Sequence, residues 1–207
     1  AQTDDMILCG GIAGENYGTI QDSDSEVTIN ARGNSMAIGG ISANNEGTVI
    51  NCSSKGKIIA AGKNNESSGT IGGIVGFNSD GFIYECYSAV SISDKSQIAY
   101  VGGICGMSNG GEVYKTSSNA NIDVKANTTL DATAYVGGIA GLSGNGLVMH
   151  SFSASPVNAE GTNVYVGGIS GYNLNGYVQS CYTINSIKQK GTASIYAGGI
   201  VGMNEEG

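Results

Sequence analysis

Tryptophan is absent from this 207-residue chain, and proline and arginine occur once each. Charged residues make up only 13 % of the sequence, half of the usual ~25 %. The scarcity of proline excludes a proline-rich disordered chain, and the absence of Gly-X-Y triplets excludes collagen despite 35 glycines. No apolar run approaches the ~18 residues of a membrane-spanning helix. We therefore predict a folded chain that does not insert into a membrane.

Basic side chains and histidine are also scarce, which limits the binding and catalytic sites that the chain can form. The net charge is −8, and basic residues cluster only at Lys55/Lys57 and Lys188/Lys190, which argues against nucleic-acid binding. The single histidine, His150, cannot form the two-histidine zinc motif of metallopeptidases, and it would have to be the base of any Ser-His-Asp triad. We interpret His150 as an outward-facing strand residue.

Acidic residues are scattered along the chain, as Glu85 and Glu112 illustrate. A glycosidase needs two carboxylates roughly 5–10 Å apart, so we predict no catalytic residue and keep a carbohydrate-active enzyme as the alternative. Asp22, Asp24 and Glu26 form a local acidic group that could bind Ca²⁺. A solvated loop is the preferred interpretation, and we predict neither a bound metal nor a cofactor.

The five cysteines contain no Cys-x-x-Cys pair. A zinc or redox motif is therefore excluded, and a disulfide scaffold does not suit a chain of this length. We predict that they are small buried apolar side chains. They are Cys9, Cys52, Cys86, Cys105 and Cys181.

A repeated phrase, Gly-Gly-Ile, dominates what the chain does contain. Successive copies begin 29 to 35 residues apart, and such a period indicates an array of one supersecondary unit. The seven copies are Gly10-Gly11-Ile12, Gly39-Gly40-Ile41, Gly72-Gly73-Ile74, Gly102-Gly103-Ile104, Gly137-Gly138-Ile139, Gly167-Gly168-Ile169 and Gly198-Gly199-Ile200.

The aligned repeats predict an all-β, parallel β-helix of about seven coils with three short strands in each. Apolar residues alternate over short runs that Gly and Asn separate, and the first strand is expected to run through Gly-Gly-Ile. Equivalent residues would then stack about 4.8 Å apart, with Ile and Val inside and Asn in hydrogen-bonded rows. The recurrent Gly would allow either a positive φ or a tight wall. A propeller is disfavoured because its blades need ~40–50 residues.

An aromatic column is the candidate recognition surface. Tyrosine stands two residues before the double glycine in four consecutive copies, and a second row joins Phe77, Met107, Leu142, Tyr172 and Met203. Exposed tyrosine rows can bind sugars or proteins. The alternative is that the rings only shield a corner of the fold. The candidate binding residues are Tyr100, Tyr135, Tyr165 and Tyr196.

The phrase Gly-Ile-x-Gly resembles the GLUG repeat, named for Gly-Leu-any-Gly. Ile replaces the Leu throughout, and Ala43 interrupts one copy. The resemblance covers nearly the whole chain and implies a bacterial surface or secreted protein, a group that includes the non-catalytic repeat region of immunoglobulin A peptidases. The matching segments include Gly73-Ile74-Val75-Gly76, Gly103-Ile104-Cys105-Gly106, Gly138-Ile139-Ala140-Gly141 and Gly168-Ile169-Ser170-Gly171.

We therefore expect a single solenoid domain over residues 1–207, belonging to a longer protein. The favoured function is a non-catalytic extracellular module that acts as an adhesin, stalk or partner-binding rod for a surface protein or glycan. The alternatives are the recognition or spacer region of a larger secreted peptidase and a carbohydrate-active enzyme. Solenoid ends without caps expose strand edges and apolar cores, so we also expect flanking domains or end-to-end self-association.

Overall fold

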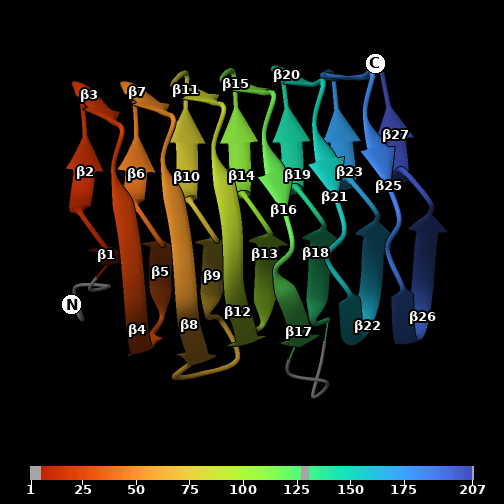
Figure 1. Cartoon of the computed structure of the whole chain (residues 1–207). Helices are drawn as coiled ribbons and strands as arrows, with labels where there is room; N and C mark the ends of the chain where they lie inside the picture. Colours follow the sequence, from red (N-terminus) through yellow and green to blue (C-terminus); the bar gives the residue numbers. More distant parts are fainter. Residues whose placement is uncertain (1–5, 127–130, 207) are drawn as a thin grey trace.

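A computed structural model describes residues 6–126 and 131–206, and all regular structure in them is β. The chain winds into a β-solenoid of about seven turns, and all strand pairs between neighbouring coils are parallel. Figure 1 shows the coils side by side, from the N-terminal coil at one end of the rod to the C-terminal coil at the other. The predicted parallel β-helix is confirmed.

Each coil contributes strands to four walls. The first wall holds β1 (Met6–Gly10), β5 (Ser35–Gly39), β9 (Ser68–Gly72), β13 (Ile98–Gly102) and β18 (Thr133–Gly137). The second holds β2 (Ala13–Asn16), β6 (Ser42–Asn45), β10 (Val75–Ser79), β14 (Cys105–Asn109), β19 (Ala140–Gly144), β23 (Ser170–Leu174) and β27 (Val201–Glu205). The third holds β3 (Thr19–Gln21), β7 (Thr48–Ile50), β11 (Phe82–Tyr84), β15 (Glu112–Tyr114), β20 (Leu147–Met149) and β24 (Tyr177–Gln179).

The fourth wall is joined to the first by two long strands, so that these two walls form one 14-stranded sheet. The joining strands are β22 (Val157–Gly167) and β26 (Ile187–Gly198). The fourth wall also holds β4 (Asp24–Gly33), β8 (Ser53–Gly62), β12 (Tyr87–Lys95), β16 (Ser117–Ser118), β17 (Asn121–Lys125), β21 (Phe152–Ser153) and β25 (Tyr182–Thr183).

Identical residues of neighbouring coils stack in register along the rod. Tyr100 pairs with Tyr135, and the following Val and Gly of these strands pair in the same way. The Ile of the repeated phrase is fully buried in the middle coils, where it points into the core as predicted. Each such side chain contributes about 1.5–3 kcal/mol of burial free energy. These core isoleucines are Ile41, Ile74, Ile104, Ile139 and Ile169.

The double glycine forms a corner and not the end of a longer strand. The first-wall strand stops at the first Gly, the next two residues bend, and a separate second-wall strand follows. A coil such as that of β1 to β4 therefore has four strands where three were expected. Neither Gly has a positive φ. A Cβ on Gly39 would lie 1.9 Å from the Ser42 carbonyl oxygen, and one on Gly40 would lie 2.1 Å from that of Gly73. Close backbone approach, the second of the two expected reasons, therefore explains these glycines.

Another corner, between the third and fourth walls, places non-glycine residues in the left-handed region. This conformation costs an L-residue roughly 1–2 kcal/mol, so the surrounding coils must impose it. His150 belongs to this column, which corrects its assignment to a strand, although it is exposed as expected. The column, with φ between 50° and 53°, comprises Asp22, Asn51, Glu85, Lys115, His150 and Ser180.

Asparagine side chains form the predicted hydrogen-bonded row at the corner after the second wall. Asn16 Nδ2 donates to Asn45 Oδ1 over 2.7 Å, and Asn45 Nδ2 donates to Asn78 Oδ1 over 2.7 Å. Near the other end, Asn173 Nδ2 donates to Asn204 Oδ1 over 2.6 Å. Ser108 and Ser143 interrupt the row in the middle coils, and Asn78 Nδ2 donates to Ser108 Oγ over 3.2 Å. In all of these bonds the amide donates toward the C-terminal end.

The cysteines are free thiols whose burial depends on their coil. Cys52, Cys86 and Cys105 are buried as predicted, whereas Cys9 and Cys181 are only partly buried in the end coils. Burial raises the pKa of Cys86 to about 12. This thiol therefore stays protonated at neutral pH, which suits an inert packing role.

One carboxyl group, Asp94 of β12, is fully buried in the core wall. Burial raises its pKa to about 7, although hydrogen bonds from Ser96 oppose the shift. Asp94 Oδ1 accepts from both the backbone nitrogen and the hydroxyl of Ser96, at 3.1 and 2.8 Å. Ionisation of this group consequently destabilises the fold.

Candidate functional site

The four predicted tyrosines stack on the outside of the first wall. The ring centroids of Tyr100 and Tyr135 lie 4.9 Å apart, those of Tyr135 and Tyr165 4.8 Å, and those of Tyr165 and Tyr196 4.9 Å. The ring planes differ by only 3°, 14° and 10°. Tyr172 of the second predicted row packs against Tyr135 and Tyr165 with centroid distances of 5.8 and 5.6 Å. We call Tyr100, Tyr135, Tyr165 and Tyr196 the tyrosine ladder.

This stacking covers the ring faces of the ladder. A sugar ring packs on an aromatic face, and the inner rings of the ladder present their edges and hydroxyl groups instead. Burial, followed by the neighbours Tyr100 and Tyr165, raises the pKa of Tyr135 to about 12. The two end members, Tyr100 and Tyr196, each have a ladder neighbour on one side only, and Tyr196 is 41 % exposed in the last coil. The geometry therefore favours the packing role for the ladder.

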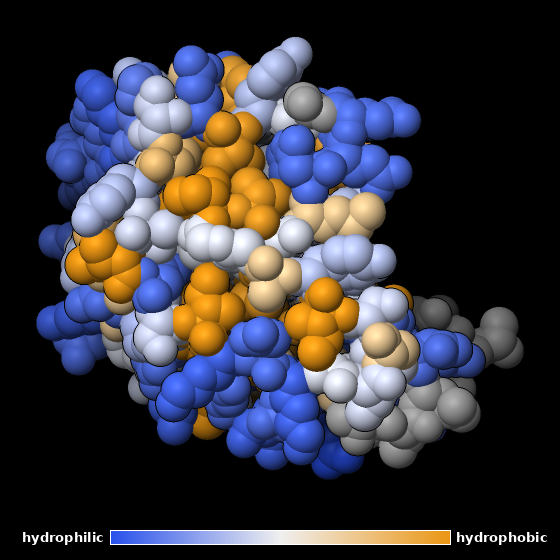
Figure 2. Space-filling view, turned by 90° about the vertical axis from the view of Figure 1, so that its right-hand side faces the viewer, coloured by the Kyte–Doolittle hydropathy of each residue, from blue (hydrophilic) through white to orange (hydrophobic). Residues whose placement is uncertain are grey.

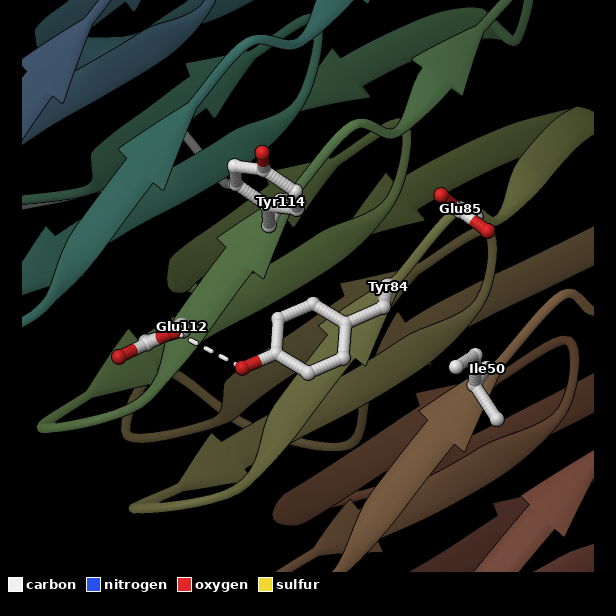
Figure 3. Close-up of a pocket in the computed structure, with 5 residues that line it drawn as sticks. All are labelled: Ile50, Tyr84, Glu85, Glu112 and Tyr114. Atoms are coloured by element: carbon white, nitrogen blue, oxygen red, sulfur yellow. Dashed lines mark hydrogen bonds between the residues drawn. The ribbon is translucent and has the colours of Figure 1, made fainter.

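A different tyrosine pair lines a shallow hollow on the third wall. Figure 3 shows its five lining residues, which come from β7, β11 and β15 and from the corner after β11. The hollow has a volume of about 330 Å³. We define the wall hollow by Ile50, Tyr84, Glu85, Glu112 and Tyr114.

The alternation of short strands places these side chains outside. In each three-residue strand the middle residue points into the core, as Val49, Ile83 and Val113 do with no exposed surface. The two flanking residues must then point outward. Parallel register brings Ile50, Tyr84 and Tyr114 into one outward column on neighbouring strands.

The rings in the wall hollow do not stack as those of the ladder do. The planes of Tyr84 and Tyr114 are nearly perpendicular, at 88°, with centroids 5.9 Å apart. Phe82 stacks on Tyr84 with a centroid distance of 5.7 Å and an interplanar angle of 28°, so one side of the Tyr84 ring is in contact with a neighbour. Figure 3 shows the Tyr84 ring lying broadside between Glu112 and Ile50. The wall hollow thus offers an aromatic face that the ladder lacks.

Two glutamates border this face, and each has a partner. Tyr84 Oη donates to Glu112 Oε2 over 2.9 Å, drawn as the dashed line in Figure 3. Burial, then the bond to Glu112, raises the pKa of Tyr84 to about 12. Glu85 forms an ion pair with Lys115 at 3.5 Å, and Lys115 Nζ lies 5.3 Å from the centroid of the Tyr114 ring. These contacts fix the carboxylates as hydrogen-bond acceptors beside the ring.

His150 belongs to the same neighbourhood. Its ring lies edge-on to Tyr114 with a centroid distance of 5.4 Å and an interplanar angle of 86°. The histidine therefore extends the aromatic surface by one coil. No hydrogen bond to a serine or an aspartate is found for it within residues 6–126 and 131–206 that would resemble a catalytic triad.

The acidic group of the first coil makes separate contacts with the second coil. Asp22 Oδ1 accepts from Asn51 at 2.6 Å, and Glu26 pairs with Lys55 at 3.0 Å. In the described part of the chain, no three His, Cys, Asp or Glu side chains gather in a way that could hold a metal ion.

Residues 6–126 and 131–206 contain no helix that is long and apolar enough to cross a membrane.

The wall hollow was not predicted as a site from the sequence. A signal was present, because Tyr84 and Tyr114 each directly follow an inward-facing apolar residue, Ile83 or Val113. The inward residues and the tyrosine ladder recur more regularly along the sequence and form the stronger pattern. Searches with the chain match no protein-family model, no curated protein and no solved structure.

Proposed function

We propose that this protein is a non-catalytic, extracellular β-solenoid rod that binds a glycan at the wall hollow. The observation that carries the proposal is the ring of Tyr84, which lines the open hollow beside two carboxylates. Ligand sites combine an apolar or aromatic lining with a few well-placed polar groups. Aromatic faces pack against the C–H groups of sugars, while Glu85 and Glu112 can accept hydrogen bonds from sugar hydroxyl groups.

The charge and shape of the rod support this ligand class. The hollow is shallow and about 330 Å³ in volume, which suits one or two sugar rings better than a protein surface. The chain carries a net charge of −8, so a neutral glycan meets no electrostatic barrier. The resemblance to GLUG repeats supports a bacterial surface location, where such a rod would act as an adhesin or a stalk.

A glycan array probed with the 207-residue chain tests the proposal, followed by calorimetric titration of the best oligosaccharide. We expect Tyr84→Ala to weaken binding at least tenfold. The matched control is Tyr87→Ala, which removes an exposed tyrosine of the fourth wall. We expect it to bind like the unchanged chain. An array without a specific signal, or equal loss in both variants, would refute the proposal.

The enzyme alternative is separated by incubating the same oligosaccharide with the chain and following its length. The glutamates of the wall hollow are each held by a partner, Lys115 or Tyr84, and we expect no cleavage. Cleavage that disappears in Glu112→Gln would replace the binding function with a glycosidase or lyase activity.

A further inference from the structure

The wall hollow differs from the rest of the rod in its charge as well as in its rings. Figure 2, which looks along the rod from its C-terminal coil, shows apolar side chains in the centre and polar ones around them. The lining of the wall hollow instead places apolar and aromatic side chains on the outside of the third wall, together with two carboxylates. The partners of these two carboxylates determine which ligand the hollow can hold.

The two glutamates of the hollow differ in their partners. Glu85 is exposed, and Lys115 compensates its charge at a distance of 3.5 Å. Glu112 is half-buried, and among the described residues no ion pair includes it. Its partner is the hydroxyl group of Tyr84, which stays neutral because burial, then the bond to Glu112, raises its pKa to about 12. The hollow therefore carries one uncompensated negative charge.

The neighbouring coils provide no basic side chain next to Glu112 on this wall. In register, Glu112 lies between Phe82 of β11 and Leu147 of β20. It is the only charged residue among the equivalent positions of the third wall, and a half-buried charge is screened less by salt than an exposed one. These positions are Thr19, Thr48, Phe82, Glu112, Leu147 and Tyr177.

A lysine of the same neighbourhood shows how the chain holds an ammonium group. Lys115 Nζ lies 5.3 Å from the centroid of the Tyr114 ring and 3.5 Å from Glu85 Oε1. One tyrosine ring and one carboxylate thus hold this cation. Tyr84 and Glu112 bring the same two groups together inside the hollow. Aromatic rings attract cations, and hydrogen bonds to an ionised group are roughly twice as strong as neutral ones.

We infer that the glycan bound in the wall hollow is an amino sugar with a free, protonated amino group. The inference rests on the glycan-binding function proposed above and names the class of glycan. The ammonium group donates to Glu112, while the sugar ring packs against the tyrosines of the lining. An N-acetylated sugar lacks the positive charge, and an acidic sugar adds a second negative one. The hollow therefore selects the amino sugar over both.

Calorimetric titration at pH 7 with two matched ligands tests the inference. The glucosamine tetrasaccharide and the N-acetylglucosamine tetrasaccharide have the same rings and linkages and differ only at the amino groups. We expect the glucosamine form to bind at least tenfold more tightly, with a smaller advantage at high salt. Tetralysine, which carries amino groups on a peptide, should bind at least tenfold more weakly than the glucosamine form.

Glu112→Gln tests the residue that carries the preference. The change keeps the size of the side chain and removes its charge, so affinity for the glucosamine form should fall about tenfold while that for the acetylated form stays unchanged. The matched control is Glu26→Gln, which changes the net charge equally on the fourth wall, where Glu26 pairs with Lys55. It should keep the preference. Thermal melting establishes that both variants are folded.

The outcomes separate this inference from the glycan-binding function. If the glycan array gives a specific signal but the glucosamine form has no advantage, or neither tetrasaccharide binds, the amino-sugar inference is wrong and glycan binding stands. A silent array with no binding of either tetrasaccharide removes both. Equal effects of Glu112→Gln and Glu26→Gln would reduce the preference to overall charge and overturn the assigned site. Tetralysine binding as tight as that of the glucosamine form would overturn the sugar as the ligand.

Discussion

Two groups of tyrosines lie on successive coils of this rod, and the angles between neighbouring rings differ between the two groups. In the tyrosine ladder the planes of successive rings differ by 3° to 14°. In the wall hollow, Tyr84 and Tyr114 meet at 88°. The rings of the ladder contact one another face to face, whereas Tyr84 stacks only on Phe82 and also lines the open hollow. The orientation of a ring, more than its regular spacing, therefore decides whether it can serve recognition.

Both groups of tyrosines pack on the same core. Within that core, Asp94 should cause the largest change of the free energy of unfolding with pH. Its pKa is about 7 in the folded chain and about 4 when unfolded. Between these values the folded state retains a proton that the unfolded state has lost, so the free energy of unfolding falls as pH rises. The loss is complete above pH 7 and amounts to roughly 4 kcal/mol, at ~1.4 kcal/mol per pKa unit.

Urea unfolding between pH 4 and pH 8 measures this effect, with Asp94→Asn as the comparison. We expect the variant to lose most of the pH dependence. An unchanged dependence would show that another group causes it. The tyrosine variants are best compared at a single pH, below the range in which the free energy of unfolding falls.

Tyr135→Ala should have the largest effect among the tyrosines. It removes a ring that contacts two ladder neighbours and Tyr172, so we expect a loss of about 3 kcal/mol. Urea unfolding at constant m-value measures it, while glycan affinity should remain unchanged. A loss of binding without a loss of stability would reverse the assigned roles of ladder and hollow.

The fold was predictable because its determinants are periodic. The Ile of the repeated phrase recurs in every copy, Val or Ile recurs on the third wall, and Asn recurs except where Ser108 and Ser143 replace it. Parallel stacking is the arrangement that brings such identical residues together. The four-residue ladder was found for the same reason. The need for glycine at the corner was predictable, but the end of the first-wall strand at that glycine was not. It depends on the close approach of Gly40 to the backbone of Gly73 in the neighbouring coil.

The wall hollow was not predictable in the same way because it is not periodic. Its column reads Ile50, Tyr84 and Tyr114, and the open face depends on the perpendicular ring angle and the bond to Glu112. Side-chain rotation of this kind leaves no repeat in the sequence.

Tyr196→Ala sharpens the comparison within the ladder itself. Tyr196 has one ladder neighbour and is more exposed than the inner rings, so we expect a loss of only about 1 kcal/mol. The measurement should use dilute protein, below any self-association. A loss as large as that of Tyr135→Ala would show that stacking on both faces is not what stabilises the ladder.

Tyr84→Phe should have the smallest effect. It keeps the ring face and removes the hydroxyl that donates to Glu112, so glycan affinity should fall only about threefold, or ~0.7 kcal/mol. Calorimetric titration distinguishes this from the tenfold or greater loss expected for Tyr84→Ala. Equal losses would place the recognition in the hydroxyl group and not in the ring face.

The most direct test of the central claim is an NMR titration of the chain with ¹³C-labelled tyrosine rings, using the oligosaccharide selected by the array. We predict that the ring signals of Tyr84 and Tyr114 shift with added oligosaccharide, while those of Tyr135 and Tyr165 stay in place. Shifts confined to the ladder tyrosines, with Tyr84 unaffected, would contradict the assignment of recognition to the wall hollow.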